Sequence, residues 1–415
     1  MNAATAAPRR TPPPAAMPPA FGARPHDDSR SFWLLAVFGG LVALAGLGAA
    51  HYMEVHGHVV TGMDNQIVWG LPHVFAIFMI VAASGVLNVA SIGSVFGQPM
   101  YKPRAPLSGL LCLALLAGGL MVLMLDLGRP ERVIVAATHY NFTSVFAWNV
   151  ILYSGMTAIV AVYLWTMFER RLNPWSKPAG IAALVWRFVL TTGTGSIFGF
   201  LVARQAYQSA LLAPLFIVLS FGWGLAVFVI VQATMYAWNG RQLAPAAAAR
   251  LARLLAIFVA ASLYLVAVFH LTNAYFARQA DFTSFLLFGN GTGQPYPLLF
   301  WLGYVLIGSV VPFALLVWPV ARAGAGLAVS AGFVVLGGFF FLYVFIIGGQ
   351  AWPLEIFPGH VVTSSFGDGQ VASYLPRWPE WVLGIGGLGA AFLLTMVGVR
   401  VLDFMPKDDL PEATS

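Results

Sequence analysis

The stretch Ile67–Phe96, IVWGLPHVFAIFMIVAASGVLNVASIGSVF, contains no Asp, Glu, Lys or Arg. Such a run is typical of a transmembrane helix, because about 20 helical residues cross the roughly 30 Å of hydrocarbon in a bilayer. Nine further runs of this kind occur along the chain, and the weakest is the fifth, where Thr191–Ser196 dilute the apolar signal. The predicted spans are Phe32–Tyr52, Ile67–Phe96, Leu107–Leu125, Ser144–Phe168, Ile181–Val202, Pro214–Met235, Leu251–Thr272, Leu298–Trp318, Gly326–Ile347 and Trp381–Val401.

Composition excludes a soluble protein. Hydrophobic residues make up 59% and charged residues 9% of the 415-residue chain, and its mean hydropathy is +0.81. A soluble domain averages about 25% charged residues. The net charge of +6 does not come from a basic cluster with interleaved aromatics, so no nucleic-acid partner is expected. We predict an all-α integral membrane protein of about ten transmembrane helices, with a disordered cytoplasmic N-tail (1–31), a membrane domain (32–402) and a cytoplasmic C-tail (403–415).

Basic residues are distributed unequally between the two sides of this topology. Of 21 Lys and Arg residues, fifteen fall on the side of the termini and five on the opposite side, while Arg187 lies within a span. Cytoplasmic loops carry an excess of Lys and Arg. The asymmetry predicts a multi-pass protein of the bacterial cytoplasmic (inner) membrane with both termini in the cytoplasm.

The histidines show the opposite bias. Only His26 is placed on the cytoplasmic side, and the other seven fall in outer loops or at outer helix ends. These are His51, His56, His58, His73, His139, His270 and His360. Histidine titrates near neutral pH and relays protons. The longer connections are also on this side, and long ordered loops usually carry function. We expect the working site at the periplasmic face.

Three segments are expected to converge there: Asp64–His73, Asp126–Arg132 and His139–Ser144, because consecutive helices usually pack side by side. His73 is predicted to lie about one turn inside the second span, where an ionisable residue is costly without a partner. It is either a proton-accepting ligand of a quinone headgroup or a structural hydrogen-bond donor to another helix. Asp126 is a proton acceptor beside the site, an ion-pair partner of Arg129 or Arg132, or both.

Further candidate ligands surround these two residues. They supply amide, hydroxyl, guanidinium and aromatic groups, a mixture that suits a headgroup with two carbonyls. They are Asn65, Trp69, Arg129, Tyr140, Asn141, Ser144 and Trp148. Two alternatives stay open: Asn141 and Ser144 are also typical helix caps, and Arg129 is also suited to orienting its loop or binding lipid headgroups.

The chain is not expected to hold a metal or redox cofactor of its own. Its one cysteine, Cys112, cannot hold an iron–sulfur cluster, which normally takes four thiolates. The histidines form no obvious facing pair within the bilayer, which argues against haem. The cluster of His51, His56 and His58 is a weak metal motif without acidic or thiol support.

Several motifs resemble the polysulphide reductase membrane-subunit (NrfD-like) family over roughly residues 30–400. They are Trp69–Pro72, Asp126–Pro130, Asn141–Ser144, Gly195–Gly199 and Tyr207–Phe216, and their order along the chain carries the resemblance. Ten spans resemble the longer branch of the family. The resemblance implies two four-helix bundles plus flanking helices, a quinone or quinol site near the periplasmic face, and no redox cofactor in the subunit. Electrons would then pass directly between the quinone and an iron–sulfur cluster of a docked periplasmic protein.

We therefore predict the quinone-interacting membrane subunit of a respiratory oxidoreductase complex, with menaquinone or ubiquinone as cofactor. The expected partners are a periplasmic iron–sulfur electron-transfer subunit, a catalytic subunit of molybdopterin, hydrogenase or multihaem type, and membrane lipids. Two alternatives remain open: a secondary transporter and a purely structural membrane anchor. Proton translocation is a further hypothesis, since Arg187 and the hydroxyls of Thr191–Ser196 could form a polar route; such hydroxyls more often bond their own helix backbone.

Overall fold

The computed structural model describes residues 30–240, 242–318, 325–354, 357, 369–402 and 404. Within them, ten helical spans are long and apolar enough to cross a membrane, so the predicted all-α membrane fold is confirmed. The spans are α1 (Arg30–His56), α2 (Leu71–Ser94), α3 (Ala105–Leu125), α5 (Val145–Phe168), α6 (Ser176–Gly199), α7 (Leu212–Trp238), α8 (Pro245–Tyr275), α10 to α11 (Tyr296–Val317), α12 to α13 (Ala325–Ala351) and α14 (Trp378–Val401). Apart from Arg30, Ser31 and Phe404, the predicted tails lie outside the described residues.

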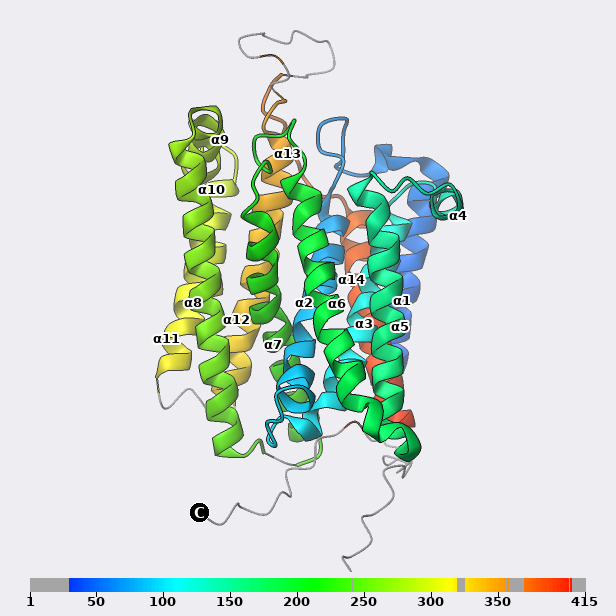
Figure 1. The fold of residues 1–415 in the computed structure, drawn as a ribbon. Helices are drawn as coiled ribbons and strands as arrows, with labels where there is room; N and C mark the ends of the chain where they lie inside the picture. Colours follow the sequence, from blue (N-terminus) through cyan, green and yellow to red (C-terminus); the bar gives the residue numbers. More distant parts are fainter. Residues whose placement is uncertain are drawn as a thin grey trace, which may run out of the picture.

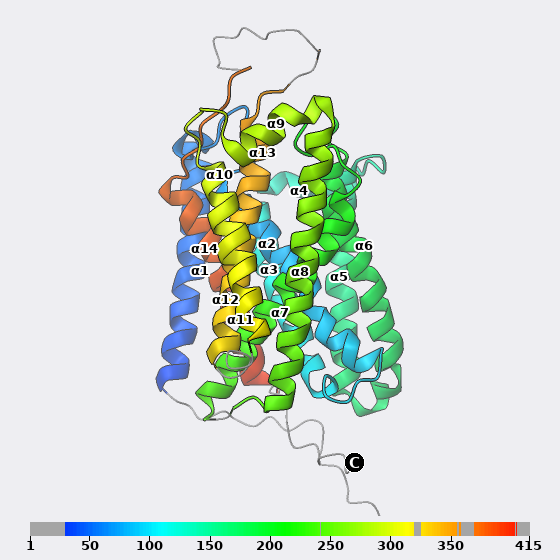
Figure 2. The ribbon, with the colours of Figure 1, turned by 90° about the vertical axis from the view of Figure 1, so that its left-hand side faces the viewer.

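The spans form two four-helix groups and a flanking pair (Figure 1). One group consists of α2, α3, α5 and α6, and the other of α7, α8, α10 to α11, and α12. Helices α1 and α14 pack together, as Figure 2 also shows, and α14 packs against α3. This is the arrangement that the family resemblance implies. The described chain begins and ends at the same end of the molecule, as an even number of spans requires.

Helix α2 lies at the centre of the molecule and is buried almost throughout. It contacts α3 and α6 of its own group, α7 and α12 of the other, and α14. The junction between the groups depends on two glycines. A Cβ at Gly85 would lie 1.6 Å from the backbone carbonyl oxygen of Ser220, and a Cβ at Gly224 would lie 2.2 Å from the carbonyl carbon of Gly85. Small residues allow membrane helices to approach this closely.

The start of α2 differs from the prediction. The span was predicted from Ile67, but the helix begins at Leu71, with Gly70 as its N-cap and Pro72 in its first turn. Proline suits this position because the first N–H groups of a helix have no intrahelical partner. His73 therefore lies in the first turn of α2, at the end of the molecule opposite the chain termini, called the outer end below. The preceding segment is free to make other contacts.

The outer end of the molecule also carries short helices that the span prediction omitted. These are α4 (Val133–Thr138) and α9 (Ala277–Phe288), both at the end opposite the chain termini (Figure 1). Two spans contain π-helical segments, Leu299–Val310 and Tyr343–Gly348. Such π-helical turns are rare in proteins overall, and those that occur are often found at functional sites.

Replacing Gly85 with Ala is expected to destabilise the protein by about 1–3 kcal/mol, because the new methyl group would force α2 and α7 apart. Gly332→Ala is the matched control, since no atom lies within 4 Å of a Cβ at that position. Thermal unfolding in detergent measures both. Equal unfolding temperatures for the two variants would contradict the close approach.

Candidate functional site

The central feature of the outer end is a contact between His73 and Asp126. His73 Nδ1 lies 2.8 Å from Asp126 Oδ2, and the two side chains are only 13% and 1% exposed. His73 is at the start of α2 and Asp126 is the C-cap residue of α3, so the adjacent packing of these helices brings together residues 53 positions apart. Among the described residues, the side-chain partner of Asp126 is His73, and the alternative of an ion pair with Arg129 or Arg132 is not formed.

The contact determines what the imidazole can do. When Nδ1 carries the proton, it donates to the carboxylate, and the Nε2 lone pair is left to accept a hydrogen bond from a ligand. A carboxylate bonded to one ring nitrogen fixes the tautomer and the orientation of the ring. The arrangement leaves His73 Nε2 as the ring atom that a ligand can contact.

Aromatic rings line one side of this pair. The Trp69 indole stacks on the His73 ring with centroids 5.8 Å apart and an interplanar angle of 20°. The ring centroid of Phe146 in α5 lies 6.1 Å from that of the same indole. The Phe198 ring of α6 meets the indole edge-on, with centroids 5.6 Å apart. Phe146 is half-exposed. Flat apolar surface from three helix ends is thus placed beside a proton-accepting group.

Two buried polar atoms lack a hydrogen-bond partner among the described residues: Asp126 Oδ1, beside His73, and the Tyr140 hydroxyl, whose ring contacts Phe142. Buried polar groups are almost always hydrogen-bonded, so each exception calls for an explanation such as an absent ligand or water. Both atoms belong to the connection between α3 and α5. A ligand with hydroxyl or carbonyl groups would satisfy them.

Three other predicted site residues instead use their polar atoms locally. The Ser144 hydroxyl accepts from the Ala147 N–H as the N-cap of α5. Asn141 Oδ1 accepts from both the backbone N–H and the hydroxyl of Thr143. The Trp148 indole N–H donates to the Phe142 carbonyl at 2.7 Å. The capping alternative thus describes Ser144, whereas Asn141 forms a turn with Thr143, and these contacts shape the start of α5.

Asn65 and Arg129 are not brought to the pair. Both side chains are exposed, and within the described ranges neither makes a hydrogen bond or ring contact with His73 or Asp126. Residues 64–67 form a turn in which Asp64 Oδ1 accepts from the N–H groups of Gln66 and Ile67.

Sequence reasoning missed Gln350, which lies in the last turn of the ninth span. Its buried side chain accepts from the N–H groups of Val68 and Trp69 at 3.1 and 3.0 Å and donates to the Trp69 carbonyl at 2.9 Å. Arg204 donates to the Gln66 carbonyl at 2.9 Å and to the Gln350 carbonyl at 3.2 Å. The second helix group therefore positions Trp69 of the first. The sequence signal that could have identified Gln350 was a single amide side chain at the end of an apolar run.

A second missed contact secures the first turn of α2. The fully buried Glu380 carboxylate accepts from the Gly62 N–H at 2.7 Å, from the Arg377 N–H at 2.8 Å and from the Tyr374 hydroxyl. That hydroxyl in turn accepts from the Leu71 N–H at 2.6 Å. Burial, together with the adjacent carboxylate, raises the pKa of Tyr374 well above its usual range, so the phenol stays protonated and donates.

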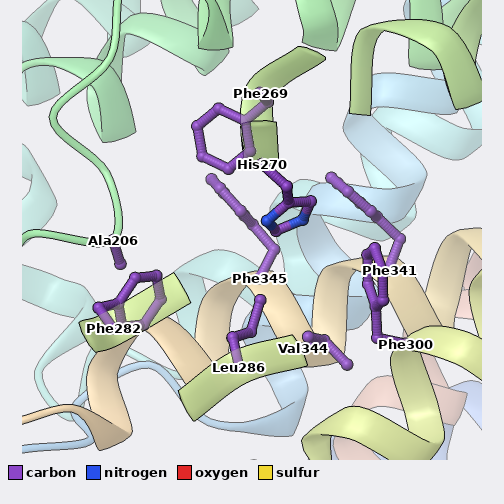
Figure 3. A pocket seen from close by; sticks show the side chains of 9 residues that line it. All are labelled: Ala206, Phe269, His270, Phe282, Leu286, Phe300, Phe341, Val344 and Phe345. Atoms are coloured by element: carbon purple, nitrogen blue, oxygen red, sulfur yellow. The ribbon is translucent and has the colours of Figure 1, made fainter. Parts of the chain in front are cut away.

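The second helix group contains a different feature, a small cavity at His270 (Figure 3). Its volume is about 10 Å³, and the lining beside His270 is mainly aromatic. His270 Nδ1 has no hydrogen-bond partner among the described residues, and Phe300 meets its ring edge-on at 4.9 Å. Phe300 and Phe345 come from the two π-helical segments. The space is about that of one water molecule, so we treat it as packing rather than a ligand site.

Arg187 is buried in the first helix group. Its guanidinium donates to Asn88 Oδ1 at 2.5 Å and lies over the rings of Phe188 and Phe221. The Thr191 and Thr194 hydroxyls donate to carbonyls of their own helix, as the alternative to a polar route predicts. In the described part of the chain, no group of three or more His, Cys, Asp or Glu residues could hold a metal ion.

Comparison with known proteins accounts for this architecture. Residues 59–353 match the family described as polysulphide reductase, NrfD. The chain belongs to this family. It is 27% identical to the Hdr-like menaquinol oxidoreductase integral membrane subunit of Archaeoglobus fulgidus, over 93% of this chain and 97% of the relative. It is 22% identical to the C subunit of selenate reductase from Mesobacillus selenatarsenatis, over 88% and 93% of the two chains.

A further NrfD relative is the menaquinone reductase integral membrane subunit of Nitratidesulfovibrio vulgaris. It is 23% identical over 88% of this chain and 89% of its own length. The predicted membership of the NrfD family is thus confirmed, and the matched region includes both the His73–Asp126 contact and Gln350.

Replacing Tyr374 with Phe is expected to lower stability by about 1–3 kcal/mol, because the buried Leu71 N–H and Glu380 carboxylate would each lose a partner. Tyr275→Phe is the control, since that side chain is 87% exposed. Thermal unfolding in detergent measures the difference. An unchanged unfolding temperature for Tyr374→Phe would show that these contacts do not secure α2.

Proposed function

We propose that this chain is the quinone- or quinol-binding membrane subunit of a periplasm-facing respiratory oxidoreductase complex. The observation that carries the proposal is the His73–Asp126 contact beside Trp69, close to the outer ends of three spans. It combines a proton acceptor with flat aromatic surface at a depth that a lipid-soluble headgroup can reach. A purely structural anchor would need neither the proton acceptor nor the aromatic surface.

The residues present fit a quinone headgroup. His73 Nε2 and the Tyr140 hydroxyl would bond its oxygens, and Trp69 and Phe146 would contact its ring. Bound quinol supplies two electrons and two protons. His73 accepts a proton at Nε2, while Asp126 stabilises the resulting imidazolium through Nδ1. Both menaquinone and ubiquinone meet these requirements.

Quinol oxidation also needs an acceptor for two electrons. We propose a periplasmic iron–sulfur subunit docked on the outer face, linked to a catalytic subunit of molybdopterin, hydrogenase or multihaem type. The relatives named as menaquinol oxidoreductase, selenate reductase and menaquinone reductase subunits support membership of such a complex. The fifteen-to-five asymmetry of basic residues supports a bacterial inner-membrane location with cytoplasmic termini.

Transport or proton translocation along α6 is the second candidate function, favoured by the buried Arg187. The structural support for this function is weaker than the support for a quinone site. Arg187 is bonded to Asn88, and the Thr191 and Thr194 hydroxyls are bonded to their own backbone, so these three groups do not form a continuous hydrogen-bonded chain.

His73→Gln and Asp126→Asn are expected to lower quinol turnover about 100-fold or more, because each removes a titrating group from the proton-accepting contact. Turnover is measured with a quinol analogue in membranes containing the assembled complex. The amount of each subunit in those membranes, measured by immunoblot, should stay at the wild-type level.

His139→Gln is the matched control for this experiment. His139 is also an outer histidine, but its side chain is exposed and contacts only Thr138 among the described residues. Its turnover should equal that of wild type. Wild-type rates in both His73→Gln and Asp126→Asn would refute the site.

Orientation is tested by labelling introduced cysteines, since the native Cys112 is fully buried. In intact spheroplasts, a membrane-impermeant maleimide should label Thr138→Cys in the outer connection but not Lys177→Cys at the opposite end, both positions being exposed. Lys177→Cys should react only after permeabilisation. The reverse pattern would overturn the proposed topology.

A further inference from the structure

A second cavity lies on the side of the Asp126 turn that faces α1. Its volume is about 100 Å³, and it is enclosed between the outer end of α1 and the turn that follows α3. Three titratable side chains line it: His51, Glu54 and His58. Leu125 and Gly128, which flank Asp126 in the chain, form the opposite wall. We call this space the α1 chamber.

The turn at Asp126 lies between the α1 chamber and the candidate quinone site. The Asp126 side chain contacts His73, while its backbone carbonyl lies 3.1 Å from His58 Nε2. When His58 donates from Nε2 to this carbonyl, its Nδ1 lone pair is left to accept a proton. The same turn thus touches the proton-accepting pair on one side and a second histidine on the other.

The chamber has the properties of a hydrated space. A water molecule occupies about 30 Å³ in the liquid and needs two to four polar partners, and the volume and lining here provide room and partners for several. Exposure rises along the lining: His58 is half-buried, whereas His51 and Glu54 are exposed. A proton reaching His58 would therefore have a titratable path to the outer solution.

We propose that the α1 chamber is the proton exit of the quinol site, an inference that rests on the proposed function. Quinol oxidation releases two protons, while two electrons leave to an acceptor in the docked partner. The His73–Asp126 contact is almost enclosed, so each proton must leave before the next turnover. The imidazolium of His73 passes a proton from Nδ1 to the Asp126 carboxylate, which restores the neutral ring. Water carries that proton to His58 at the chamber wall, and His51 and Glu54 pass it to the periplasmic solution. Quinone reduction uses the same path inward.

The test uses two substitutions of His58 in the complete complex. His58→Gln keeps an N–H donor for the Asp126 carbonyl but cannot carry a proton, so the fold should be retained. His58→Ala opens space for added imidazole. We expect quinol oxidation to fall about tenfold or more in both variants, with a larger solvent isotope effect. Imidazole should restore the rate of His58→Ala but not that of His58→Gln. The Kd of a fluorescent quinol analogue should remain within about twofold of wild type in both.

His56→Ala is the matched control. His56 is exposed, bonds the Tyr52 carbonyl and does not line the chamber, so its rate should not change. Wild-type turnover in His58→Gln, or a lowered rate in His58→Ala that imidazole does not raise, would overturn the exit path. If His73→Gln and Asp126→Asn still lower quinol turnover, either outcome overturns only the exit path and not the proposed quinone site. Wild-type rates in those two variants would instead mean that the proposed function fails.

Discussion

The hydrocarbon core of a membrane contains no water to bond peptide groups or hydrate charges, and this constraint shapes the whole molecule. Backbone N–H and C=O groups must be bonded within each span, which restricts the spanning structures to helices or closed barrels. Ionisable groups are driven to the helix ends for the same reason. Arg187 shows what an exception requires: a side-chain amide, a backbone carbonyl and two aromatic rings surround its guanidinium. The candidate chemistry therefore lies where helices end.

Positions at helix ends are useful only if the ends are held in place. The segment before α2 has no regular secondary structure at residues 67–70, yet its backbone is bonded from two directions. Gln350 holds Trp69 from the second helix group, and Tyr374 with Glu380 holds Leu71 from the start of α14. The Glu380 carboxylate also lies at the N-terminal end of α14, where the helix dipole favours negative charge. These contacts place the Trp69 indole on His73 before any ligand arrives.

The two helix groups have similar layouts but different polar content. At its outer end the first group brings a carboxylate and an imidazole together beside Trp69. The second group encloses His270 among phenylalanine rings in a space of about 10 Å³. Proton chemistry thus has support in one group only, while the second contributes Gln350 as a positioning residue. The α1 chamber adds a function for α1, which otherwise flanks the first group.

The sequence by itself determined the number of spans, because hydropathy is a local property that can be summed along a chain. It also singled out His73 and Asp126, since ionisable residues at helix ends in an apolar sequence are conspicuous. Only the tertiary structure decided that these two side chains meet, that Asn141 and Ser144 serve as turn and cap residues, and that Arg129 is exposed. Sequence reasoning could not identify Gln350, Tyr374 and Glu380 either. Each lies about 280 or more positions from its partner at or before the start of α2. Such contacts depend on the rotation and register of packed helices, which side-chain packing sets and which no local pattern encodes.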